Sequence, residues 1–143
     1  MESAADLKAK GAEAFKARNY EEAKTFFQSA IASGHNETLN LLNNIGLCCQ
    51  KLEQYEDAIS TYTEVLQSPG CEQDTERKGY VRRAKCYFEQ GRWREAYCDI
   101  QQIDMEVLRW EDKKAMLKYR EEILEHIGPE LGLLPMDAKQ ASE

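Results

Sequence analysis

Hydrophobic residues recur at helical spacing in six successive segments of the chain. Apolar residues three and four positions apart share one face of an α-helix, so the pattern predicts amphipathic helices and an all-α fold. The clearest stripe is formed by Leu39, Leu42, Ile45, Gly46, Cys49 and Leu52. The six stripes and the turn residues between them predict helices over residues 4–17, 20–33, 37–52, 55–67, 73–90 and 93–103.

Short turns join the predicted helices in pairs, and longer loops separate the pairs. The short turns are Arg18-Asn19, Glu53-Gln54 and Gly91-Arg92. The longer loops contain Ser33-Gly34-His35 and Ser68-Pro69-Gly70, whose glycine and proline interrupt helices. At the start of the chain, Ser3 and Asp6 have the spacing of a helix-capping box. The chain therefore reads as three helical hairpins.

The three hairpins repeat one another in six columns, at repeat lengths of 35 and 38 residues. Written in the order of the copies, the columns are Leu7, Leu42 and Tyr80; Gly11, Gly46 and Ala84; Tyr20, Tyr55 and Trp93; Ala23, Ala58 and Ala96; Phe27, Tyr62 and Ile100; and Ala30, Val65 and Ile103. The Gly/Ala columns let neighbouring helices approach closely, and the large apolar column fills the space between them.

A further helix follows the third hairpin. A stack of hairpins needs its last apolar face covered, and residues 110–127 are suited to that, with a short turn near Met105–Leu108 before them. The apolar positions of this capping helix are Leu117, Tyr119, Ile123, Leu124 and Ile127. Gly128-Pro129 ends it, and residues 129–143 are expected to be a flexible tail. The apolar tail cluster of Leu131, Leu133, Leu134 and Met136 either packs back on the capping helix or belongs to a loose linker.

Composition narrows the function. The 143 residues carry a net charge of −7, which argues against general binding to nucleic acid or anionic membrane. No stretch approaches the roughly 20 apolar residues of a membrane span, and the first residues do not resemble a secretory signal. We therefore expect a cytoplasmic protein.

No catalytic or cofactor-binding pattern is found. Five cysteines without Cys-x-x-Cys spacing read as buried reduced thiols, and two isolated histidines, His35 and His126, make a zinc site improbable. Trp93 and Trp110 are expected to be packing anchors rather than base-stacking platforms. We expect a non-catalytic module without cofactors.

The first helices of the hairpins carry the candidate binding chemistry. In a curved stack these helices line the concave side, which places Lys8, Asn44, Lys78 and Arg82 across one groove. Lysine offers a point charge, arginine a bidentate fork and asparagine an amide donor, a set that suits a peptide carboxylate. The alternative is a solvated face in which Arg82 and Arg83 pair with Glu76 or Asp74.

The columns containing Leu7, Gly11, Ala23, Phe27 and Ala30 resemble the tetratricopeptide repeat signature over about residues 4–103. The resemblance implies a right-handed superhelical stack of three hairpins with a C-terminal capping helix. It divides the chain into a domain of residues 1–128, with repeats at about 4–36, 37–70 and 73–104 and the capping helix at about 110–127, and a tail at 129–143. Pro69 stands near the unit end where the family favours proline.

The candidate set resembles the carboxylate clamp of co-chaperone tetratricopeptide domains. Lys8 matches its first lysine, Asn44 the asparagine of the second unit, and Lys78-Gly79-Tyr80-Val81-Arg82 its Lys-x-x-x-Arg. The resemblance implies an adaptor for the acidic C-terminal tail of a heat-shock chaperone. Ala12 replaces a clamp asparagine and removes a donor, and Leu47 narrows the groove. The alternative function is a scaffold or assembly subunit that binds an internal segment of a partner.

Overall fold

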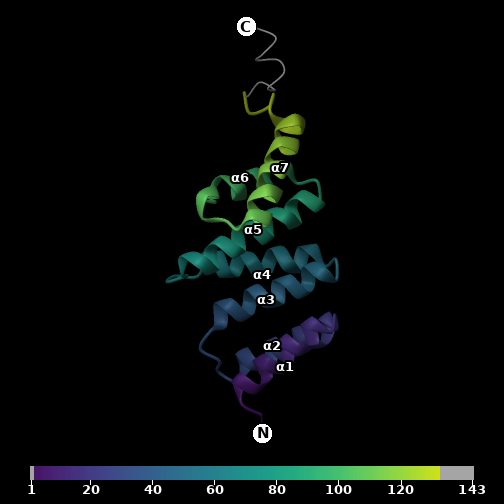
Figure 1. Ribbon diagram of the computed structural model, residues 1–143, viewed down its shortest axis with the longest axis vertical. Helices are drawn as coiled ribbons and strands as arrows, with labels where there is room; N and C mark the ends of the chain where they lie inside the picture. Colours follow the sequence, from purple (N-terminus) through teal and green to yellow (C-terminus); the bar gives the residue numbers. More distant parts are fainter. Residues whose placement is uncertain (1, 133–143) are drawn as a thin grey trace.

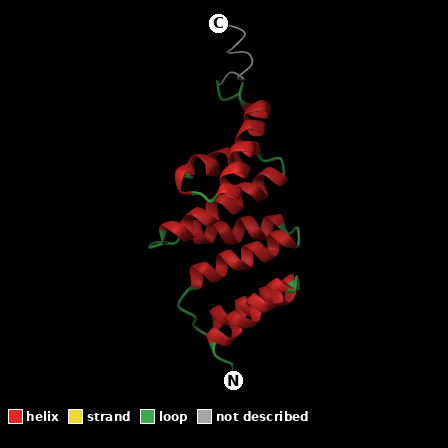
Figure 2. Cartoon of the chain, in the orientation of Figure 1, coloured by secondary structure: helices red, strands yellow, loops and turns green. Residues whose placement is uncertain are grey.

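The computed structural model describes residues 2–132, which form helices and connecting turns without a strand in that range (Figure 2). The helices are α1 (Ala4–Lys16), α2 (Tyr20–Ala32), α3 (Thr38–Lys51), α4 (Tyr55–Gln67), α5 (Gln73–Glu89), α6 (Trp93–Gln101), the 3-10 helix η1 (Met105–Val107) and α7 (Trp110–Ile127). Every helix predicted from the sequence is present, with ends that shift by two residues at most, and the predicted turn before the capping helix is η1. Figure 1 shows the pairs stacked from the N-terminus to α7.

The helix ends confirm the local predictions. Ser3 and Asp6 form the capping box of α1 through reciprocal side-chain to backbone bonds. Each intra-hairpin turn contains one residue in the left-handed region, namely Arg18, Glu53 and Gly91, with φ of 64°, 61° and 70°. The three hairpins therefore turn in the same way although only the third has glycine at this position.

The small residues of α1 and α3 provide the predicted close approach. A Cβ added at Gly11 would lie 2.6 Å from a ring carbon of Phe27, and one at Gly46 would lie 2.5 Å from a ring carbon of Tyr62. Such distances are far shorter than ordinary carbon contacts, so only glycine fits beneath these rings. In the third hairpin the columns carry Ala84 and Ile100, so a larger residue in the first helix accompanies a smaller one in the second.

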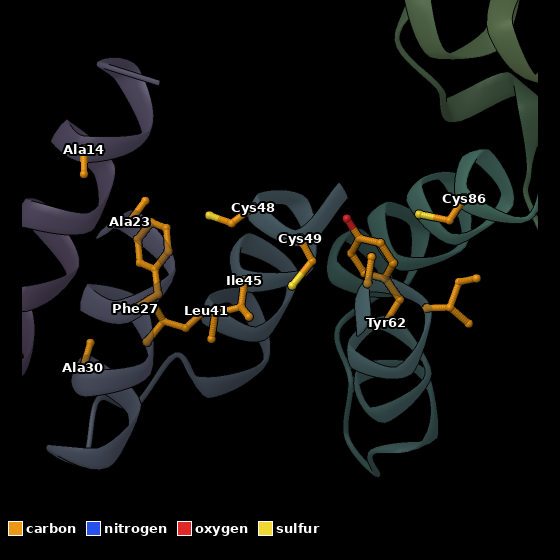
Figure 3. Packing of buried hydrophobic residues seen from close by; sticks show 12 residues of the cluster. Ala14, Ala23, Phe27, Ala30, Leu41, Ile45, Cys48, Cys49, Tyr62 and Cys86 are labelled. Atoms are coloured by element: carbon orange, nitrogen blue, oxygen red, sulfur yellow. The ribbon is translucent and has the colours of Figure 1, made fainter. Parts of the chain in front are cut away.

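Two clusters make up most of the interior formed by residues 2–132. The first extends through the first two hairpins to α5 and includes Phe27, Leu41, Tyr62 and the thiols of Cys48, Cys49 and Cys86 (Figure 3). The second joins the third hairpin to α7 and includes Val81, Ala84, Ile100, Met116 and Ile123. Tyr87 packs against both clusters. The stack is therefore continuous from α1 to α7.

The capping helix α7 contacts the third hairpin as predicted, on a stripe that differs from the predicted one by one position. Met116, Ile123 and Ile127 are buried, whereas Leu117 is 36% exposed. Positions 116, 119, 123 and 127 lie on one face at helical spacing, and position 117 is turned about 100° away from it. Leu131 packs against this cluster, while Leu133, Leu134 and Met136 lie outside the described residues.

The two tryptophans have different environments. Trp93 stacks on His126 with ring centroids 4.5 Å apart and packs edge-on against Phe88, as expected of a packing anchor. Trp110 is 71% exposed, so the same prediction was wrong for Trp110. It stands at the first position of α7, before the stripe that faces the third hairpin begins.

Cys48, Cys49 and Cys86 are buried as predicted, whereas the prediction of a buried thiol was wrong for Cys98. Burial raises the pKa of Cys48 to about 11 and that of Cys86 to about 12, whereas Cys98 is exposed on α6. Since the thiolate is the reactive form, we expect an alkylating reagent at neutral pH to label Cys98 first and to leave Cys48, Cys49 and Cys86 unlabelled. Peptide mapping by mass spectrometry measures this, and labelling of all five in denaturant is the control. Fast labelling of Cys48 in the native protein would contradict the packing.

No helix within residues 2–132 has the length and apolar character to cross a membrane.

Candidate functional site

The largest cavity described, about 600 Å³, is an open groove between α3, α5, the segment around η1 and α7. Its volume lies in the range of ligand-binding clefts. One face of α5 forms its floor. Its lining residues are Leu47, Gln50, Lys51, Tyr55, Asp74, Arg77, Lys78, Val81, Arg82, Lys85, Glu89, Val107, Leu108, Arg109, Asp112 and Tyr119. We call this cavity the basic groove.

The basic groove has the opposite charge to the chain as a whole. Six cationic side chains line it, against three carboxylates. The cations are Lys51, Arg77, Lys78, Arg82, Lys85 and Arg109, and the carboxylates are Asp74, Glu89 and Asp112. The basic groove is thus a local excess of positive charge in a chain whose net charge is −7.

Two of the predicted site residues, Lys78 and Arg82, lie together in the basic groove. They are one turn apart on α5, so their side chains leave the same face of the helix. The Arg82 guanidinium donates a hydrogen bond of 3.3 Å to the backbone carbonyl of Asn43 on α3. The structure therefore brings this arginine to the residue adjacent to Asn44.

Asn44 lines a neighbouring pocket of about 190 Å³ between α1 and α3, together with Ala12, Phe15, Lys16, Phe27 and Leu47. Leu47 lines this pocket and the basic groove alike, so the two cavities are adjacent. The pocket is apolar because Ala12, two phenylalanines and Leu47 form most of its wall. Asn44 thus lies beside the groove, with an apolar recess on its other side.

Lys8 lines neither of these two cavities. Its ammonium is 2.5 Å from the carboxylate of Glu37, just before α3, and this pair connects the first hairpin to the second. The hydrogen bond from Lys8 holds the pKa of Glu37 below its ordinary value. The structure therefore gives Lys8 a partner within the chain, and a ligand would have to exchange with Glu37 to reach it.

The alternative pairing considered for Arg82 and Arg83 is wrong. Asp74 pairs instead with Arg77 at 3.0 Å and with Lys78 at 3.3 Å. Arg83 turns away from the groove and forms a bidentate pair with buried Asp99 of α6, at 2.8 and 2.6 Å. Sequence spacing missed this pair because the partners lie in different helices of the third hairpin.

Several groove residues were not anticipated. Lys51 could have been found from helical spacing, because Asn44, Leu47 and Lys51 follow one another at three and four residues on α3. Val107 and Arg109 lie in the irregular segment before α7, where no periodic pattern indicates which side chain faces the groove. They line the groove together with Asp112 and Tyr119 of α7.

Comparisons with known proteins agree with the repeat. A family model described as Tetratricopeptide repeat matches residues 39–68, which include α4 and all but the first residue of α3. DnaJ homolog subfamily C member 7 of Mus musculus is 33% identical over 121 residues, and its Homo sapiens counterpart is 31% identical over 121 residues. Each alignment covers 78% of this chain and 23% of the relative. The chain thus spans about a quarter of the length of the curated relatives it matches.

Proposed function

We propose that this tetratricopeptide-repeat chain is a co-chaperone adaptor, which binds the acidic C-terminal tail of a heat-shock chaperone in the basic groove. Tetratricopeptide repeats are non-catalytic modules that bind protein partners, and both relatives are named as DnaJ homologues. The observation that carries the proposal is the meeting of Lys78 and Arg82 in a groove with three more cations than carboxylates. We assign residues 1–128 to the binding module and expect it to act in the cytoplasm.

The chemistry of the groove fits a carboxylate-bearing peptide. Arg82 offers further guanidinium donors beyond the one bound to the Asn43 carbonyl, and Lys78 is 54% exposed. Asn44 supplies an amide at the edge of the groove. Together these groups would hold a terminal carboxylate and the acidic side chains before it through charge-assisted hydrogen bonds.

Ala12 limits the affinity of this site. An asparagine at this position would add an amide donor to the pocket that already contains Asn44. A hydrogen bond to a charged group contributes about 1.5–3 kcal/mol, so its absence weakens carboxylate binding by roughly tenfold or more. We therefore propose a weak to moderate interaction that depends on several contacts at once.

A peptide titration tests the proposal. Calorimetry with a peptide that ends in Glu-Glu-Val-Asp is expected to show binding that is weakened at least tenfold by Lys78→Ala with Arg82→Ala, since two charged donors are lost. Binding should also weaken as salt is added. The matched control is Lys114→Ala with Lys118→Ala, the same charge change one turn apart on α7, at exposed positions that do not line the groove.

Two results would overturn the adaptor function. One is an affinity weaker than millimolar for the tail peptide. The other is an affinity that Lys78→Ala with Arg82→Ala does not lower more than the control variant does. This result would show that Lys78 and Arg82 do not contact the ligand.

A scaffold function is the second candidate, and the apolar pocket of Ala12, Phe15, Phe27 and Leu47 favours it. Such a pocket accepts an apolar side chain from an internal segment of a partner without using a terminal carboxylate. A tail peptide with an amidated C-terminus separates the two functions. Unchanged binding after amidation supports the scaffold, and loss of binding supports the adaptor.

A further inference from the structure

Carboxylates of the chain itself occupy the basic groove. Asp74 lies on α5 and contacts both Arg77 and Lys78, at 3.0 and 3.3 Å. Asp112 lies on α7 and contacts Lys85 at 3.4 Å. Both aspartates line the same cavity as the cations they contact. Three of the six groove cations are therefore already paired with carboxylates of the groove itself.

These ion pairs contribute little to stability, so a ligand carboxylate can replace their aspartates. The side chains of Asp74 and Lys78 are 64% and 54% exposed, and those of Asp112 and Lys85 are 35% and 29% exposed. Ion pairs open to water contribute at most about 1 kcal/mol each, because water and salt screen them. The buried pair of Arg83 and Asp99, by contrast, faces away from the groove. An incoming carboxylate can thus replace Asp74 or Asp112 at little cost.

We propose that Asp74 and Asp112 are internal competitors of the ligand, which hold the groove lysines until an acidic peptide displaces them. This inference rests on the proposed function, since it concerns the same groove. Each aspartate occupies the hydrogen-bonding directions of an ammonium that a ligand carboxylate would use. Binding is then an exchange of one carboxylate for another. The aspartates consequently set the affinity of the groove, although they do not bind the ligand.

Lys8 shows the same arrangement at the other end of the stack. Its ammonium is held by Glu37, whose side chain is 45% exposed. The pairs of Lys8 with Glu37, Lys78 with Asp74 and Lys85 with Asp112 thus resemble one another. In each, a lysine on the first helix of a hairpin pairs with an acidic residue from a nearby turn or helix start. The chain keeps these lysines neutralised without burying them.

Removal of the internal carboxylates tests the inference. Asp74→Asn and Asp112→Asn preserve side-chain shape and are each expected to strengthen binding of the Glu-Glu-Val-Asp peptide by roughly two- to fivefold, the free energy of one exposed ion pair. The two effects should multiply, since the aspartates have different partners. The double variant should also lose more affinity than the native chain as ionic strength rises, because its binding creates net new ion pairs.

A matched control separates this effect from net charge. Glu2→Gln with Glu130→Gln also removes two carboxylate charges. These residues pair with Lys10 and Arg94 at 2.6 and 2.7 Å and do not line the groove. This control variant is expected to leave the affinity within about twofold of native.

The outcomes distinguish the two proposals. If binding depends on Lys78 and Arg82 but the double aspartate variant does not bind more tightly than the control, the competitor role is wrong and the adaptor function stands. Weaker binding of Asp74→Asn would mean that Asp74 contacts the ligand directly, which also overturns the inference. If the native chain and the double variant both fail to bind the peptide, both proposals fail. Binding by the variant alone would overturn the adaptor function of the native chain, while it would support the competitor role of the aspartates.

Discussion

Replacement of Arg83 by methionine is expected to lower the free energy of unfolding by about 3–5 kcal/mol, because it leaves a buried carboxylate without a partner. The Asp99 side chain is 4% exposed and that of Arg83 is 16% exposed. Arg83 also donates to the Thr63 hydroxyl at 3.0 Å and stacks over the rings of Tyr80 and Tyr87. One side chain thus connects α4, α5 and α6.

Chemical denaturation monitored by circular dichroism measures this effect. Arg94→Met is the control, because Arg94 pairs with Glu130 at 2.7 Å while both side chains are 58% exposed, so its loss should cost less than about 1 kcal/mol. Arg83→Met with Asp99→Leu removes both charges and is expected to recover most of the stability. A similar loss in the Arg83 and Arg94 variants would show that Asp99 is hydrated rather than buried.

The second large effect is expected at Gly46. An alanine there would place its Cβ 2.5 Å from Tyr62, whose ring is fully buried and whose hydroxyl donates to Gln50 at 2.9 Å. Because the ring is held at both ends, the added methyl forces the two helices of the hairpin apart. We expect a net loss of about 1–3 kcal/mol in unfolding free energy, even though alanine favours the helix.

A compensating change makes the Gly46 prediction specific. Gly46→Ala with Tyr62→Ile reproduces the pairing found at Ala84 and Ile100, and it should be more stable than the sum of its single variants. Gly79→Ala serves as a comparison, because its Cβ would lie 3.1 Å from the flexible end of Leu66 and should cost little. Thermal unfolding of Gly46→Ala, Tyr62→Ile, the double variant and Gly79→Ala measures these differences in stability. Equal losses at Gly46 and Gly79 would refute the close approach beneath Tyr62.

The sequence predicted the hairpins because their packing is local and repeated. A small residue at Gly11 or Gly46 and a large one at Phe27 or Tyr62 lie sixteen residues apart in each unit, so three copies show the same constraint. Lys78 and Arg82 were placed together for the same reason, since their positions on one helix fix their common face.

Most of the remaining features depend on contacts between units, which no repeated spacing records. The pair of Lys8 with Glu37 joins residues 29 apart, and that of Lys85 with Asp112 joins residues 27 apart. Each depends on the particular path of the loop or segment between two units. The same reason explains why the exposure of Trp110 and the position of Arg109 could not be predicted from the sequence.

Because the interior is divided into two clusters, a ligand in the basic groove would affect how firmly they are held together. Leu47 and Asn44 extend from α3, whose inner face belongs to the first cluster, whereas Lys78 and Arg82 extend from α5 beside Val81 and Ala84 of the second. The groove therefore spans both clusters, which Tyr87 connects. A peptide bound across it contacts both, so part of its binding free energy opposes their separation. A peptide bound in the basic groove would stiffen the contact between the two clusters. Any change that loosens this contact would weaken peptide binding.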